Sequence, residues 1–226
     1  MEPIAHLRLV EKSEPPEYDE QTLKAHNENS GKYAAEALRC IKLDKVGSFC
    51  GNIHDLGKAT KKFFDYIQPG NTLRRGEVNH TFAAVRYIFE MSDGVDNEVR
   101  ELLAYAVGAH HGQFDAVNDD HKNGFEHRLT KDGIDYDEAK KNFNEYCFSD
   151  AELKSQFDEA AEQLTKIIAG IRERNPKRSA RQAEEYEFQI SLLARLLLSA
   201  VIEGDRRDTA EFMENMEFPQ VEADWD

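Results

Sequence analysis

The stretch Asn52-Ile53-His54-Asp55-Leu56-Gly57-Lys58 decides how the rest of the chain is interpreted. It places an imidazole beside a carboxylate, and borderline metals such as manganese, iron, cobalt, nickel and zinc accept nitrogen and oxygen donors together. The aspartate has two oxygens with which it can bridge neighbouring ions. Gly57 would let the backbone turn sharply after the pair, as the position after a helix often requires. A His-Asp pair alone is weak evidence for a metal site, so further donors elsewhere in the chain decide its value.

Further candidate donors occur along most of the chain: His26, His80, the doublet His110-His111, and Asp205. The spacing of His26 with Tyr33 and Ala37 predicts that it faces the inside of a helix bundle. His110 continues the apolar stripe of a predicted helix, whereas His111 points elsewhere on it, so both rings can serve one ion only near the helix end. Five of the seven candidate donors are imidazoles, which suit Mn, Ni, Co or Fe better than Mg.

Apolar spacing and capping residues predict a succession of helices. They are expected over about 21–41, 46–53, 61–67, 80–91, 97–110, 150–174 and 183–203. Thr60 and Asp96 are the expected N-caps of two of them, and Ser149 with Glu152 forms a capping box for a third. Asp205 would then lie at the C-terminal end of the last helix. The helix dipole disfavours a carboxylate there, and a nearby cation would explain its presence.

Two segments show no regular pattern. Residues 1–18 contain three prolines and several glutamates, and we expect them to be irregular; no segment of the chain predicts a strand. Residues 112–135 are also expected to be irregular, with His121 and His127 on the surface. The domain is expected to span 1–213, and the acidic residues 214–226 would form a tail or the start of a linker.

A dense basic stretch runs from Arg172 to Arg181 in a chain of net charge −15. It could guide a nucleic-acid strand, or it could be the solvated end of a helix, since basic residues there complement the helix dipole. Arg74 and Arg75 in the loop 69–79 could also meet phosphates, although a solvated loop is the simpler interpretation. The net charge argues against a stand-alone DNA-binding module, but not against a nuclease whose bound cations meet the phosphates.

Length and composition set the broad class. The chain has 226 residues, which suits one domain with its own core. No apolar run reaches the roughly eighteen residues that a membrane span needs, and no signal peptide is visible at the N-terminus. The three cysteines, Cys40, Cys50 and Cys147, have no metal-like spacing and indicate a reduced, cytoplasmic protein.

Taken together, these motifs resemble the HD superfamily of metal-dependent phosphohydrolases. More narrowly, they resemble the HD nuclease domain of the CRISPR-associated helicase-nuclease of type I systems. The matching elements are His26, His54-Asp55 with Lys58, His80-Thr81, Ala109-His110-His111-Gly112 and Gly204-Asp205-Arg206. Gly204 is a departure, because alanine is expected before the final aspartate; both residues are small.

The resemblance implies an all-α HD-domain helical bundle with a central dinuclear metal site. One divalent ion would be held by His26, His54, Asp55 and Asp205. The other would be held by Asp55, His80, His110 and His111, so that Asp55 bridges the two. Asp55 and Lys58 would be the catalytic residues, with Lys58 stabilising charge on the phosphorus centre or the leaving oxygen.

The resemblance also implies a substrate and partners. The substrate would be DNA, chiefly single-stranded, cut by endo- and exonucleolytic hydrolysis in antiviral defence. The partners would be a helicase domain or subunit, which this sequence lacks, and an RNA-guided surveillance complex. Two alternatives stay open: an HD-type nucleotidase or phosphodiesterase acting on small nucleotides, and a docking domain that has lost turnover. An open groove across the metals would favour the nuclease, and an enclosed pocket the nucleotidase.

Overall fold

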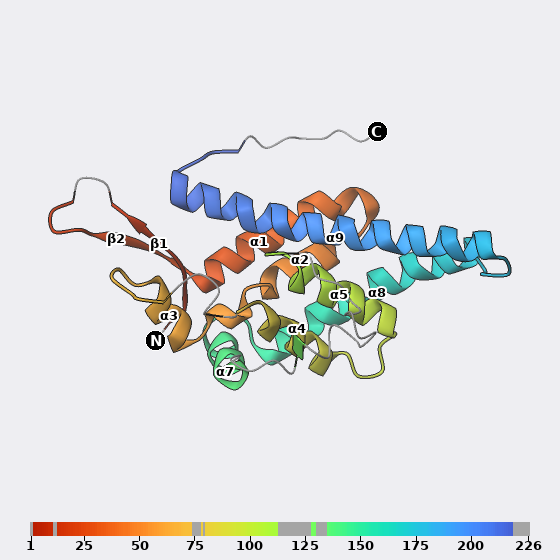
Figure 1. Ribbon diagram of the computed structural model, residues 1–226, viewed down its shortest axis with the longest axis horizontal. Helices are drawn as coiled ribbons and strands as arrows, with labels where there is room; N and C mark the ends of the chain where they lie inside the picture. The colour runs from red at the N-terminus through yellow and green to blue at the C-terminus, as the bar shows by residue number, and fades with distance from the viewer. Residues whose placement is uncertain are drawn as a thin grey trace.

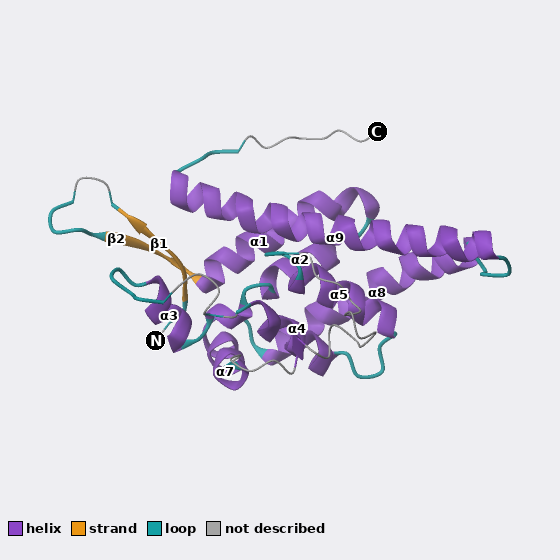
Figure 2. Cartoon of the chain, in the orientation of Figure 1, coloured by secondary structure: helices purple, strands orange, loops and turns teal. Residues whose placement is uncertain are grey.

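The computed structural model describes residues 2–10, 13–73, 78, 80–112, 128–129 and 135–218. Helices dominate it, as Figures 1 and 2 show. They are α1 (Leu23–Leu38), α2 (Asp44–Ile53), α3 (Lys61–Ile67), α4 (Thr81–Met91), α5 (Asn97–Gly108), α7 (Tyr136–Tyr146), α8 (Asp150–Arg174) and α9 (Ala180–Glu214). Single 3₁₀ turns cover Arg39–Ile41 and Leu56–Lys58. The all-α class expected from the sequence is confirmed.

The N-terminal segment differs from its expectation, because it contains a two-stranded antiparallel hairpin. Strand β1 (Ile4–Leu9) pairs with β2 (Tyr18–Thr22), with Leu9 opposite Tyr18 and Ile4 opposite Thr22. Two of the three N-terminal prolines, at 15 and 16, lie in the connection, where they remove no ladder hydrogen bond. The prediction of an irregular segment was wrong because tertiary contacts stabilise the hairpin: Arg8 donates to the carbonyl of Phe212 at 2.7 Å, beside the end of α9.

The three helix caps expected from the sequence are confirmed. The Thr60 hydroxyl accepts from the backbone N–H of Phe63 at 3.2 Å, and the Asp96 carboxylate accepts from that of Glu98 at 2.9 Å. Ser149 forms the complete capping box with Glu152. Helix α7 was not predicted, although its buried side chains Tyr136, Ala139 and Phe143 recur at helical spacing.

Helix α9 is much longer than predicted. It lies along one side of the molecule, over α1 (Figure 1), and continues through Gly204 to Glu214 before Asn215 adopts a left-handed conformation. Asp205 therefore lies inside the helix, and the expectation that it ends the helix was wrong. Glycine often marks a helix end. Here it permits close packing, because a Cβ atom at Gly204 would lie less than 3.0 Å from the carbonyl oxygen of Ser30 in α1.

One hydrophobic core joins the helices. Its largest fully buried side chains include Phe49 of α2, Tyr87 of α4, Leu103 of α5 and Phe157 of α8. Within the described part of the chain, no helix combines the length and the apolar character of a membrane span.

Close backbone packing carries the donor residues toward each other. A Cβ atom on Gly51 of α2 would lie 2.5 Å from the Cα atom of Gly31, so α1 and α2 cross almost in backbone contact. Gly57 was expected to let the backbone turn sharply, but its φ angle is not positive. Among the described glycines, positive φ angles occur at Gly70 and Gly94. Gly57 is needed for proximity instead: its missing side chain leaves room for the main chain of His80.

Candidate metal centre

All seven donor residues predicted from the sequence lie together. They form two groups that share Asp55, and the candidate donor atoms of each group lie within 4.8 Å of one another. We name these the inner group, formed by His26, His54, Asp55 and Asp205, and the outer group, formed by Asp55, His80, His110 and His111. They are the same two sets that the resemblance implied.

Helix ends supply most of these side chains. His54 is the C-cap residue of α2, and Asp55 follows it. His80 is the N-cap residue of α4, while His110 and His111 lie in the turn after α5 ends at Gly108. Because the helix ends before the doublet, both rings can face the same side, which a continuing helix would prevent.

The inner group is more enclosed than the outer group. Oδ2 of Asp55 lies 3.3 Å from Nε2 of His26 and 3.3 Å from Nε2 of His54. From α9, Oδ1 of Asp205 approaches the same two nitrogens at 3.4 and 3.7 Å. The side chains of His26, His54 and Asp55 are 0 % exposed. Two imidazoles and two carboxylates thus converge in the interior.

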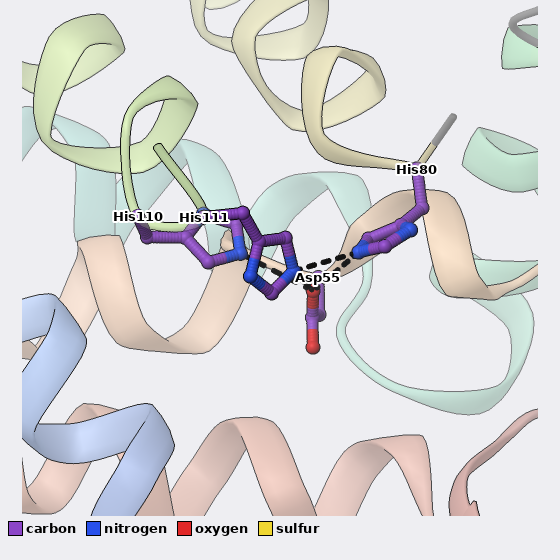
Figure 3. A group of neighbouring side chains, drawn as sticks. All are labelled: Asp55, His80, His110 and His111. Carbon is purple, nitrogen blue, oxygen red and sulfur yellow. Dashed lines mark hydrogen bonds and ion pairs between the residues drawn. The ribbon is translucent and has the colours of Figure 1, made fainter. Parts of the chain in front are cut away.

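The outer group gathers around the other oxygen of Asp55 (Figure 3). Its Oδ1 lies 3.7 Å from Nε2 of His80, 3.5 Å from Nε2 of His110 and 4.0 Å from Nε2 of His111. The His111 side chain is 44 % exposed and that of His80 is 18 % exposed, so this group opens to solvent. Each oxygen of Asp55 faces one group, which is the arrangement of a bridging carboxylate.

Four of the donor atoms fit metal ions because they have no hydrogen-bond partner in the described part of the chain, whereas Nε2 of His80 and Nε2 of His111 lie 2.8 Å from each other. Nε2 of His26, His54 and His110 and Oδ1 of Asp55 are buried and have no hydrogen-bond partner among the described residues. Buried polar atoms normally have partners. The opposite ring nitrogens are engaged: Nδ1 of His54 lies 2.7 Å from the carbonyl of Gly51, and Nδ1 of His110 contacts that of Val107. Such contacts hold Nε2 toward a metal.

The charges of the two groups differ. Burial alone would lower the pKa of His26, but the carboxylates of Asp205, Asp208 and Asp55 raise it to about 9. Burial likewise opposes the charged form of His54, yet Asp55 and Asp205 raise its pKa to about 10. In the outer group, burial lowers the pKa of His80 to about 3 and that of His111 to about 4. The inner rings must therefore release protons when they coordinate a cation, whereas these outer rings are already neutral at pH 7.

Lys58 lies against the shared carboxylate. Its Nζ is 2.6 Å from Oδ2 of Asp55, and only 7 % of its side chain is exposed. Its ammonium also lies 5.4 Å from the centre of the Phe63 ring. Lysine is seldom buried without a partner, so this side chain is a defined part of the site and not a surface residue.

Two residues near the inner group were missed by sequence reasoning. Asp208 of α9 contacts Nδ1 of His26 at 2.6 Å. Its position three residues after Asp205, on the same helix face, was the available signal. His6 of β1 packs its ring edge-on against His26, with ring centroids 4.8 Å apart. Burial first, and then Lys58 and His26, lower the pKa of His6 to about 3. The unpredicted hairpin explains why no local signal pointed to His6.

The basic stretch is far from the metal centre and largely paired with acids. Arg172 bonds Asp96 and Glu98, each at 2.8 Å. Arg181 and Lys177 likewise pair with Glu185 and Glu187. With a rise of about 1.5 Å per residue, Arg181 lies roughly 36 Å from Asp205 along α9. This favours a solvated helix end over a strand-guiding surface. Arg74, Arg75, His121 and His127 lie outside the described residues.

The comparison with family models bears on this geometry. The family described as "Cas3, HD domain" matches residues 20–201. The chain belongs to this family. The match includes six of the seven candidate donors and ends before the seventh, Asp205. No curated protein matches the sequence significantly.

Membership of the Cas3 HD family gives the chain its general chemistry. It is an HD-type, metal-dependent hydrolase. HD domains bind divalent metals, and the inner and outer groups are the clusters of this chain that could hold them.

Proposed function

We propose that this protein is a metal-dependent DNA nuclease that hydrolyses phosphodiester bonds in single-stranded DNA during type I CRISPR interference. The observation that carries the proposal is the pair of donor groups sharing Asp55. Two-metal sites of this kind act on both the attacking and the leaving oxygen of a phosphodiester.

The inner and outer groups would each hold one divalent cation. Manganese, nickel, cobalt or iron would suit them better than magnesium, because five of the seven donors are imidazoles. When bound, the two cations supply the Lewis acidity that activates water and stabilises charge on the phosphate oxygens. The ligands would be His26, His54, His80, His110, His111 and Asp205, and Asp55 would be shared by both cations.

Residues of the chain itself would complete the reaction. Asp55 has both oxygens directed at donor nitrogens and would hold the two cations at a fixed separation. Lys58 carries its positive charge 2.6 Å from this bridge and would donate hydrogen bonds to a phosphate oxygen as negative charge develops there. The contacts of His54 with Gly51 and of His110 with Val107 keep the two rings oriented while substrate binds.

Substrate would reach the metal centre from the side of the outer group. The His111 side chain is 44 % exposed, those of His80 and Asp205 are 18 % and 15 % exposed, and those of His26 and His54 are sealed inside. A DNA strand would approach from the outer side. Strand delivery would depend on the helicase domain or subunit and the RNA-guided complex of the same system, because the chain as a whole repels polyanions with its charge of −15. Residues 1–213 would form the nuclease domain and 214–226 a tail or linker start; 219–226 lie outside the described residues.

The test combines a polymer with small substrates. The purified chain is incubated with single-stranded DNA and, separately, with nucleotides and cyclic dinucleotides, in manganese, nickel, magnesium or chelator. Metal-dependent loss of the DNA is expected, and Asp55→Ala should abolish it because the bridging carboxylate is gone. Turnover confined to the small nucleotides would make the chain a nucleotidase instead, and metal binding without turnover of any substrate would make it a docking domain.

A further inference from the structure

A third carboxylate, Asp208, lies behind the inner group. It follows Asp205 by three residues in α9, so helical geometry turns both side chains toward α1. Asp205 faces Nε2 of His26 at 3.4 Å, and Asp208 contacts Nδ1 of the same ring at 2.6 Å. The His26 ring is therefore held between two carboxylates of one helix.

The Asp208 carboxylate is itself fixed from three sides. Its Oδ2 accepts from Nε2 of Gln21 at 2.9 Å and contacts His26, while its Oδ1 accepts from Nδ2 of Asn29 at 2.7 Å. Its side chain is 2 % exposed. Among the described residues, His26 is the ion-pair partner of Asp208 within 4.0 Å. The negative charge of Asp208 is therefore directed at this ring and is not neutralised by a lysine or arginine of the described chain.

The partner of His26 differs from the partners of the other oriented rings. Nδ1 of His54 and Nδ1 of His110 each meet a neutral main-chain carbonyl, at Gly51 and Val107. A carboxylate in that place fixes the proton on Nδ1, leaves the lone pair on Nε2, and makes the ring a stronger donor to a metal. It also adds negative charge near the inner group, which already contains Asp205 as well as Asp55.

In the part of the chain that the structure describes, no carboxylate supports a ring of the outer group in this way. The shared Asp55 is the only carboxylate in this group. Nδ1 of His80 is buried and has no hydrogen-bond partner among the described residues. His111 is 44 % exposed, so water competes for its position. The two groups thus differ in charge, in enclosure and in how firmly their rings are held.

We propose that Asp208 is a positioning residue of the metal centre: it fixes the His26 ring and strengthens cation binding at the inner group, so that the inner group fills before the outer group. This inference rests on the proposed metal centre and concerns binding, so its test needs no DNA cleavage.

The test is calorimetric titration of the metal-free chain with Mn²⁺, compared among variants. The wild-type chain should show a tight and a weaker phase. Asp208→Asn keeps the size of the side chain but removes its charge, and Asp208→Ala removes the contact altogether. Loss of such a supporting carboxylate costs about 10- to 100-fold in metal affinity. The tight phase should weaken by about that factor in both variants, more in Asp208→Ala, while the weak phase stays unchanged.

Glu211→Gln is the matched control. It makes the same change of charge in the same helix, but Glu211 bonds the Tyr33 hydroxyl and Arg207 and not a donor ring. Both phases should be as in wild type. Asn29→Ala provides a milder variant if Asp208→Ala does not fold, because it removes the contact at Oδ1 alone. It should weaken the tight phase by about threefold, a fraction of the effect of removing the carboxylate.

Thermal unfolding of each metal-free variant separates positioning from a general structural role. If Asp208→Asn folds and retains the wild-type tight phase, Asp208 does not position His26. Equal weakening of both phases would also overturn the inference, because the effect would not be local to the inner group. A wild-type chain that binds no Mn²⁺ would refute the proposed function itself, and this inference with it.

Discussion

Replacing Gly204 by alanine should destabilise the protein, although alanine is the better helix former. Within an ordinary helix the change gains about 1 kcal/mol. At Gly204 the new methyl group would lie less than 3.0 Å from the Ser30 carbonyl oxygen, with the Ser30 carbonyl carbon at 3.1 Å and its Cα at 3.3 Å. These are main-chain atoms of α1, so no side chain can turn aside to make room.

The expected magnitude follows from two opposing effects. Carbon–oxygen contacts of this kind settle at about 3.3–3.6 Å, so α9 must move away from α1 by about 1 Å. Overpacking a tight contact costs about 1–3 kcal/mol, occasionally more. We take the upper part of that range, about 2–3 kcal/mol. Subtracting the gain of about 1 kcal/mol in helix propensity leaves an expected net loss of stability of about 1–2 kcal/mol. For a domain of this size each kcal/mol lowers Tm by about 2–4 °C.

The assay is thermal and denaturant unfolding of the metal-free variant, paired with Gly170→Ala as control. A Cβ atom at Gly170 of α8 would meet only the end of the Arg174 side chain, at 3.5 Å. Gly170→Ala should therefore raise Tm by a few degrees through helix propensity, which is worth about 1 kcal/mol. Metal binding at the inner group should also weaken in Gly204→Ala, because α1 carries His26 and α9 carries Asp205. A Gly204→Ala protein as stable as wild type would refute this account of the α1–α9 contact.

Three further outcomes follow from the site. Lys58→Ala should bind metal as wild type does but slow cleavage by about 10²-fold, the usual effect of losing one transition-state donor; calorimetry and single-turnover kinetics separate the two, and lost metal binding would contradict the assigned role. The pKa values of about 9 for His26 and about 10 for His54 lie above the 6.5 of a free histidine. The protonated rings of His26 and His54 therefore stabilise the folded state fully below the pKa of 6.5 that they have in the unfolded chain. This stabilisation is lost as the pH rises through their pKa values in the folded chain. In chelator, Tm should accordingly fall from neutral pH to pH 10, whereas metal affinity should rise over the same window; a Tm that climbs would argue against protonated inner rings. Cleavage should be far stronger in Mn²⁺ than in Mg²⁺, because imidazole-rich sites favour borderline metals, and equal rates across concentrations would count against the ligand assignment.

Much of the fold and the site could be predicted from local sequence. The caps Thr60, Asp96 and Ser149 mark helix starts through single side-chain contacts with the next turn, which a sequence displays directly. The seven donors could be assigned to two groups because the resemblance supplied their pairing. The spacing of the seven donors along the sequence does not by itself show which of them share an ion.

The remaining features depend on contacts between distant segments. Gly204 looks like a helix end locally, and its true role appears only when α1 lies against it. The hairpin depends on Arg8 reaching the end of α9, about two hundred residues later in the chain. Asp208 became recognisable as a partner of His26 only after α9 was known to continue beyond Gly204. Tertiary packing decided each of these three points.

The most direct test of the central claim uses circular single-stranded DNA, which has no ends and so reports endonucleolytic cleavage. The metal-free chain is loaded with Mn²⁺ and compared with Asp55→Ala and with wild type in chelator. The account predicts that wild type with Mn²⁺ linearises and then degrades the circle, while Asp55→Ala and the chelated protein leave it intact. A wild-type chain that binds two Mn²⁺ ions yet leaves the circle intact would contradict endonucleolytic cleavage by this site. An Asp55→Ala variant that cuts as fast as wild type would contradict the role of Asp55.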